Sequence, residues 1–258
     1  MYGLDYNLIE GLMLGFIRTG TAIALLPVFG YTAVPTQIKA GLALVLAVAL
    51  APSGAQHIAA MPPGVIPIAA AAVSEIMVGL VFGLVGLLLL ASAQFMGSII
   101  DIQIGYGFAS IADPQFGQIS ILGKIEYTFA LIVFIVFDVH HKLIEALGYS
   151  FRVIPLGGAV FPAQISMSYL RLSAEILVIG VKLGAPVIAM LFMIQIGLGF
   201  MARVMPRMNV FLMSFPLQIG VGLIGLAITL PLFVYILSGS FDYFLSGLIR
   251  IIAAMAGR

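Results

Sequence analysis

One short stretch in the middle of the chain is the only cluster of side chains that could bind a metal ion. Asp138, His140, His141 and Glu145 fall within eight residues, and His141 and Glu145 would share one face of a helix. A structural zinc site needs four converging ligands, whereas adjacent histidines point about 100° apart on a helix. Asp138 also has Lys142 as an ion-pair partner at the favourable i,i+4 spacing. We therefore expect ion pairs at a solvated helix end, with no metal ion and no cofactor; a histidine-dependent metal protein is a weaker alternative.

A second set of ionisable side chains could carry protons or ions, because each lies at the edge of a long apolar stretch. Ionisable groups within a membrane often mark proton relays and ion pathways. This makes a secondary transporter or ion-coupled carrier the main alternative function. The side chains concerned are Glu75, Asp101, Glu175 and Lys182. We favour structural roles for these charges and for Arg18, with Arg171 neutralising Glu175 and Lys182 reaching an interface.

Enzymatic and nucleic-acid-binding functions have no support in the sequence. It contains no G-x-S-x-G elbow, P-loop or H-E-x-x-H motif. Cysteine is absent, which excludes disulfides and thiolate chemistry. A net charge of +1 without a Lys/Arg cluster gives no basic surface for nucleic acid. We expect a protein that is not an enzyme and does not bind nucleic acid.

The elements that carry these side chains are predicted to be long apolar helices. Hydrophobic residues make up 62% of the chain and charged residues only 8%, against about 25% in soluble domains. Apolar segments of helical length cover residues 6–29, 37–50, 65–104, 124–139, 171–202 and 210–237. Residues 153–170 contain Pro155, Gly157 and Pro162, which favours an interfacial crossing or an irregular connection. The pattern predicts an all-α, polytopic membrane protein of about six helices arranged as hairpins.

Glycines at helical spacing indicate close helix packing. Small residues let helix backbones approach each other, and the faces concerned carry Gly79 and Gly83, then Gly180 and Gly184. Such faces serve packing within the chain or contacts with partner subunits equally well. The Lys and Arg residues divide almost evenly between the two sides of a six-span arrangement, so they do not define its orientation. This even division suggests that some helices are buried in a multi-subunit assembly.

The longest interruption of the apolar pattern is a glycine-rich loop over residues 105–123. It contains four glycines and an Asp113-Pro114 step, so it cannot form one regular helix. Loops of this length without secondary structure are uncommon and usually functional. Apolar bulk from Phe108, Ile111 and Phe116, on a backbone made pliable by glycine, suits a segment that folds into a narrow lumen. A surface loop that packs only locally is the alternative.

Short motifs spread over almost the whole chain resemble the FliR family of the flagellar type III protein export gate and its counterparts in virulence secretion systems. Lys39, Val139 and Gln195 depart from the family pattern, where Arg, Gly and Asn or Asp are usual. The matching motifs are Arg18, residues 26–30, Val34-Pro35, Glu75 with Gly79 and Gly83, residues 101–107 leading to 113–115, residues 138–141, Ser150-Phe151, residues 154–157, residues 185–187, Leu198-Gly199, residues 203–211 and residues 215–217.

The resemblance implies one membrane-associated export-gate subunit over residues 1–258. Its residues 1–170 would resemble a FliP-type subunit, and residues 171–258 would form a FliQ-type helical hairpin with a tail. The implied partners are FliP-type and FliQ-type subunits, an FlhB-type switch subunit, the lipid membrane and unfolded flagellar proteins in transit, in the basal body of the bacterial inner membrane. The loop over residues 105–123 would be the channel plug, formed by Gly105, Gly107, Phe108, Ile111, Asp113, Pro114, Phe116 and Gly117. Residues expected in helix packing or subunit contacts are Gly79, Gly83, Gly180, Gly184, Pro206, Asn209 and Phe211.

Overall fold

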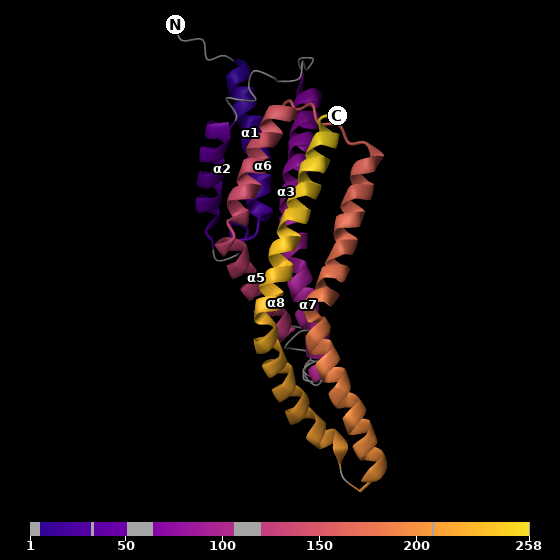
Figure 1. Cartoon of the computed structure of the whole chain (residues 1–258). Helices are drawn as coiled ribbons and strands as arrows, with labels where there is room; N and C mark the ends of the chain where they lie inside the picture. Colours follow the sequence, from indigo (N-terminus) through magenta and orange to yellow (C-terminus); the bar gives the residue numbers. More distant parts are fainter. Residues whose placement is uncertain (1–5, 32–33, 51–63, 106–119, 208, 258) are drawn as a thin grey trace. The chain divides into compact units, whose positions relative to one another are not determined.

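The described part of the protein is entirely helical, which confirms the predicted fold class. The computed structural model describes residues 6–31, 34–50, 64–105, 120–207 and 209–257, and no strand occurs among them. Seven helices are present in these residues (Figure 1). They are α1 (Tyr6–Leu25), α2 (Thr36–Leu50), α3 (Val65–Ile104), α5 (Ile121–Val136), α6 (Val139–Val153), α7 (Ala163–Val204) and α8 (Val210–Met255).

The expected number of about six helices does not hold for the described residues, because an apolar-run criterion overlooks amphipathic helices. Asp138 has a left-handed backbone with φ of 54°, which ends one helix and starts another. The resulting helix α6 buries Val139, Leu143 and Leu147 but carries charges on its other face. For the same reason α8 continues well past residue 237, where the prediction ended. Helix α7 likewise begins at Ala163, within the stretch that was expected to be an interfacial crossing or an irregular connection.

The chain divides into two compact units. The first consists of Met1–Leu89, Asp138–Ser173 and Phe241–Arg258, and the second of Leu90–Phe137 and Ala174–Ser240. Helices α3, α7 and α8 therefore contribute to both units. The boundaries of these two units differ from those of the FliP-like and FliQ-like parts that the resemblance implies. Those parts describe likeness to other subunits, so they stay a prediction.

In the first unit, helix α1 packs on α3 at two glycines one turn apart. A Cβ atom on Gly79 would lie 2.7 Å from the carbonyl oxygen of Arg18, and one on Gly83 would overlap the side chain of Leu25. The absence of side chains at these two positions lets the helix backbones approach closely. Helix α2 is joined to α1 by the Thr19 hydroxyl, which donates to the carbonyl oxygen of Ala43 over 2.9 Å. This packing brings the polar side chains of α1 and α3 into a buried interior.

In the second unit, the C-terminal half of α3 crosses α5 and α7 at further glycines. A Cβ atom on Gly97 would lie 2.6 Å from Cα of Gly123 in α5, and one on Gly180 in α7 would lie 2.7 Å from Cδ1 of Phe95. On α7, Gly184 faces Met96 in the same way. The two faces predicted from glycine spacing thus lie against helices of the chain itself, while a role in subunit contacts stays a prediction.

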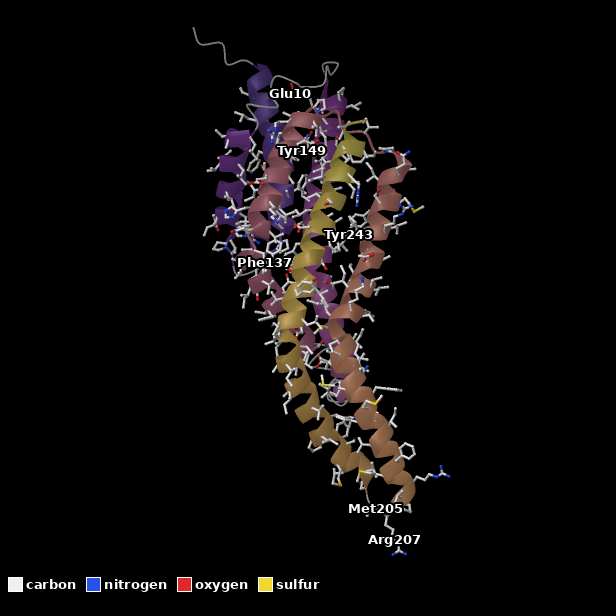
Figure 2. All side chains as sticks on the ribbon, viewed as in Figure 1. Glu10, Phe137, Tyr149, Met205, Arg207 and Tyr243 are labelled. Atoms are coloured by element: carbon white, nitrogen blue, oxygen red, sulfur yellow. The ribbon has the colours of Figure 1, made fainter. Side chains whose placement is uncertain are left out.

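Helices α7 and α8 form an antiparallel hairpin whose outer surface is apolar. Three helices among the described residues are long and apolar enough to cross a membrane, namely α3, α7 and the part of α8 from Leu212. On the hairpin, the side chains of Phe200, Val204 and Leu212 are 66%, 77% and 70% exposed. Met205 and Arg207 lie at the turn that joins the two helices (Figure 2). Exposed apolar area of this extent marks a surface that is covered by lipid or by other proteins.

Candidate functional site

The two ends of the glycine-rich loop are held together by Asp101, near the C-terminus of α3. The carboxylate of Asp101 accepts hydrogen bonds from the Ser120 hydroxyl and from the backbone N–H of Leu122, the latter over 3.1 Å. Ser120 is the N-cap of α5, and its Oγ accepts from the backbone N–H of Gly123 over 2.8 Å. A carboxylate at a helix N-terminus is also favoured by the helix dipole. We call Asp101, Ser120 and Leu122 the loop base.

The loop base depends on close backbone contacts that only glycine permits. Gly97 and Gly123 bring the backbones of α3 and α5 together one turn before Asp101, so a short carboxylate side chain can reach the first turn of α5. Gly105 ends α3 with φ of +93°, and a Cβ atom there would lie 2.5 Å from the ring of Phe215 in α8. Glycine at position 105 thus provides both the left-handed turn and the space for this ring.

The structure shortens the predicted loop and leaves its centre undescribed. Ile121, Leu122 and Gly123 belong to α5, so the segment between the two helices ends at Ser120 instead of Gly123. Of the eight predicted plug residues, only Gly105 lies within the described residues. The others, which lie outside them, are Gly107, Phe108, Ile111, Asp113, Pro114, Phe116 and Gly117.

Arg18 and Glu75 form a buried ion pair at the centre of the first unit. Both side chains have an exposure of 0%, and the guanidinium contacts the carboxylate through Nε and Nη2, the latter over 3.0 Å. Arg18 also lies over the ring of Phe151, with Cζ 4.6 Å from the ring centroid. Oε1 of Glu75 accepts a further hydrogen bond from the N–H of Gly157 over 2.8 Å. The pair therefore connects α1 and α3 to α6 and to the segment that follows it.

Two of the four side chains that could carry protons or ions are engaged in other contacts. Glu75 is neutralised by Arg18, and Asp101 is engaged in the loop base. Glu175 is half-buried and Lys182 is exposed on α7, and neither forms an ion pair with another described residue of its unit. Glu75 and Asp101 belong to different units. Of the four side chains, Glu75 and Asp101 are thus held by partners within their own units.

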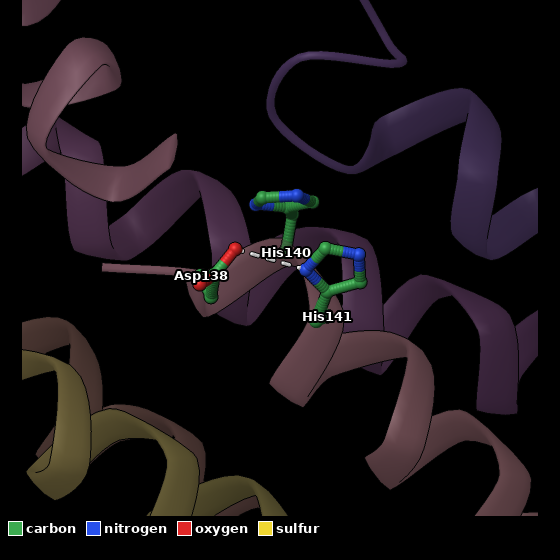
Figure 3. Close-up of side chains that lie close together, drawn as sticks. All are labelled: Asp138, His140 and His141. Carbon is green, nitrogen blue, oxygen red and sulfur yellow. Dashed lines mark hydrogen bonds and ion pairs between the residues drawn. The ribbon is translucent and has the colours of Figure 1, made fainter. Parts of the chain in front are cut away.

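The cluster at the start of α6 is arranged differently from the sequence-based expectation. The expected partner of Asp138, Lys142, instead donates to Oδ1 of Asp242 in α8 over 3.2 Å. Asp138 contacts His141, with 3.0 Å between Oδ1 and Nδ1. The rings of His140 and His141 lie side by side, with centroids 4.2 Å apart, although adjacent positions on a helix were expected to diverge (Figure 3). The expected Asp138–Lys142 ion pair is wrong.

The remaining predicted contact residues lie at the turn between α7 and α8. Pro206 is exposed in this turn, and Oδ1 of Asn209 accepts a hydrogen bond from the backbone N–H of Leu212 over 3.2 Å. This bond satisfies one of the free N–H groups at the start of α8. The backbone of Phe211 is helical, and its side chain lies outside the described residues. The turn presents Arg203 and Arg207 as exposed cations.

The sequence analysis missed a buried carboxyl group on α5. Glu126 is only 3% exposed, and its Oε2 has no hydrogen-bond partner among the described residues. Burial raises the pKa of Glu126 from 4.5 to about 7. The burial of Glu126 could have been predicted from its spacing. Glu126 lies four residues from both Leu122 and Ala130 and so shares their buried face of the helix.

We expect the Glu126→Gln variant to lose a pH dependence that the native chain shows. Because the folded-state pKa of about 7 lies above the unfolded value of about 4.5, the folded state holds the proton more tightly. The native free energy of unfolding should therefore fall as the pH rises between these two values, by on the order of 3 kcal/mol. Urea unfolding in detergent, followed by circular dichroism from pH 5 to pH 8, measures this fall. Glu145→Gln, at an exposed position on α6, should keep it; an equal fall in Glu126→Gln would contradict the assignment.

Comparison with known proteins gives one consistent family. A sequence model of the family described as "Bacterial export proteins, family 1" matches residues 9–244. The chain is 31% identical to the flagellar biosynthetic protein FliR of Bacillus subtilis (strain 168), over 92% of each chain. It is 28% identical to FliR of Escherichia coli (strain K12), over 84% of this chain and 82% of the relative. It is 27% identical to FliR of Aquifex aeolicus (strain VF5), over 90% of each.

These matches cover the helices that carry both polar centres. The family model includes Arg18, Glu75, Asp101 and the whole predicted loop over residues 105–123. The relatives match along nearly their full length, so the likeness is not confined to one apolar helix. By sequence and by its all-helical structure, the chain belongs to family 1 of the bacterial export proteins, the family of the FliR proteins.

Proposed function

We propose that this protein is a structural subunit of the bacterial flagellar type III export gate. Family membership supports this, because the relatives are named as flagellar biosynthetic proteins and the family as export proteins. In this role the protein forms, together with FliP-type and FliQ-type subunits, a channel for unfolded flagellar proteins in the cytoplasmic membrane. An FlhB-type subunit acts on the same assembly. No catalytic step by this chain is part of the proposal.

The observation that carries the proposal is the exposed apolar surface of the α7–α8 hairpin. Phe192, Met193 and Phe200 on α7 are 55%, 63% and 66% exposed, and Ile228 on α8 is 68% exposed. Between Lys182 and Arg203 there is no charge, so this part of α7 is suited to lipid or to partner helices. In the proposed assembly the hairpin is the FliQ-like part of the chain, and residues 1–170 are the FliP-like part.

The loop base supports the proposed plug. Asp101 and Ser120 fix the points at which the glycine-rich segment leaves α3 and enters α5. We place the plug in residues 105–123, closing the channel when no substrate is in transit.

Purification of the complex from membranes tests the proposed function. The full chain, tagged at one end and extracted from a flagellated bacterium in mild detergent, should bring FliP-type and FliQ-type chains with it at fixed ratios. The helices of the hairpin require such neighbours or lipid to cover their apolar faces. Recovery of this chain alone, together with solute uptake by proteoliposomes that Glu175→Gln abolishes, would favour the secondary transporter instead.

A further inference from the structure

We propose that Asp138, His140 and His141 form a binding site for a divalent transition-metal ion of the zinc class. The three side chains each present a ligand atom, and these atoms all lie within 4.8 Å of one another (Figure 3). Two imidazole nitrogens and one carboxylate oxygen are a donor set that suits zinc, cobalt and nickel. The site lies at the first turn of α6 in the first unit and shares no residue with the loop base or with the Arg18–Glu75 pair.

The backbone at Asp138 directs its carboxylate toward the histidines. Asp138 is the N-cap residue of α6, yet its side chain makes no capping hydrogen bond. Its φ of 54° lies in the left-handed region, which Asp adopts more readily than most residues but still at some cost. The carboxylate instead faces Nδ1 of His141 over 3.0 Å. A side chain that gives up its usual capping role for this position has gained another contact, and a metal ion bound by both atoms would take the place of the proton between them.

The neighbouring lysine does not compete for the site. In sequence, Lys142 is placed to neutralise Asp138, but its ammonium lies 3.2 Å from Oδ1 of Asp242 in α8. The carboxylate of Asp138 therefore faces only the two imidazoles among the described residues. Two neutral imidazoles and a carboxylate leave one negative charge, which a divalent cation compensates.

The distances require only a small adjustment to close around a metal ion. In a tetrahedral zinc site, ligand atoms bound at about 2.0–2.2 Å lie roughly 3.4 Å apart. The widest separation here is at most 4.8 Å, and the side chains of Asp138 and His141 are 70% and 66% exposed. Rotation of these exposed side chains brings the three atoms to ligand distances, and water completes the coordination. The bound ion would fix the first turn of α6.

Metal titration of the purified full chain tests the site. The chain should carry an affinity tag without histidine and be titrated in detergent with Zn²⁺ by calorimetry and with Co²⁺ by visible absorption. We expect saturable binding of one ion per chain, weakened by about tenfold or more in His140→Gln, His141→Gln and Asp138→Asn. Zn²⁺ should also raise the midpoint of thermal unfolding of the native chain and not that of these variants.

Two control variants separate this site from other ligands of the chain. His57→Gln removes the third histidine, and Glu145→Gln removes a carboxylate four residues from His141; both should bind Zn²⁺ as the native chain does. Circular dichroism establishes that each variant is folded. Native-like binding by His141→Gln and Asp138→Asn would overturn the proposal. So would the absence of saturable binding of Zn²⁺ and Co²⁺ by the native chain.

Discussion

Replacement of Arg18 with methionine is expected to lower the free energy of unfolding by about 3–5 kcal/mol. The substitution removes the positive partner of Glu75 and leaves its carboxylate at 0% exposure. Of the described residues, the N–H of Gly157 would then be the one remaining partner of that charge, together with solvent that reaches the site. Breaking one half of a buried ion pair costs far more than an exposed pair contributes, because the remaining charge has lost its hydration. Urea unfolding in detergent, followed by circular dichroism, measures the loss.

A double variant separates two contributions to the free energy of unfolding, the penalty for an unpaired buried charge and the net stabilisation by the ion pair. In Arg18→Met/Glu75→Leu both charges are replaced by apolar side chains of similar size, and such replacements are often close to neutral. The double variant should therefore recover most of the stability that Arg18→Met loses. A loss below about 1 kcal/mol in Arg18→Met would mean that Glu75 is readily hydrated or neutral in the folded chain. Equal losses in both variants would instead assign the effect to the packing of Arg18 on Phe151.

The same pair illustrates what the sequence could and could not predict about the polar centres. Arg18 and Glu75 were both predicted to be structural charges, Glu75 from its place at the edge of an apolar stretch. Their contact could not be predicted, because it joins residues 57 positions apart and depends on how α1 packs over Gly79 and Gly83. The bond from Gly157 to Glu75, over 82 positions, depends on the same packing. Long-range contacts of this kind need the tertiary structure.

The helices show the same division between local and long-range information. The predicted helix over residues 65–104 is confirmed as α3, because an apolar run bounded by a Pro/Gly-rich stretch and by Gly105 is defined locally. Helix α6 was missed, since its apolar face is stabilised only by what packs against it. Ser120 was counted within the loop, yet it is the N-cap of α5 and a partner of Asp101. The predicted end of the glycine-rich loop at Gly123 was too late, since α5 begins at Ile121, and the loop itself stays a prediction.

Deletion of residues 110–117 is expected to make the assembled channel leak ions. The size of the leak should increase with the width of the pore that the deletion leaves open. The deletion removes Ile111, Asp113, Pro114 and Phe116, which supply the bulk of the predicted plug. It keeps the loop base, because Asp101, Ser120 and Leu122 are unchanged. The six residues left between Gly105 and Ser120 reach up to roughly 20 Å, so they can join the two helices without strain. Loss of the seal would then follow from the missing bulk and not from a misfolded unit.

Conductance of the purified complex in planar bilayers measures the leak, and we expect it to rise by about tenfold or more over the native complex. A variant in which residues 110–117 are replaced by glycine and serine at equal length separates bulk from length. This variant should also leak, because a flexible polar chain does not exclude water and ions from a lumen. Asp101→Asn keeps the plug residues but weakens the loop base, since an amide accepts hydrogen bonds less strongly than a carboxylate. It should leak less than the deletion does. An undiminished seal in the deletion and in the glycine-serine variant would show that residues 105–123 do not close the channel.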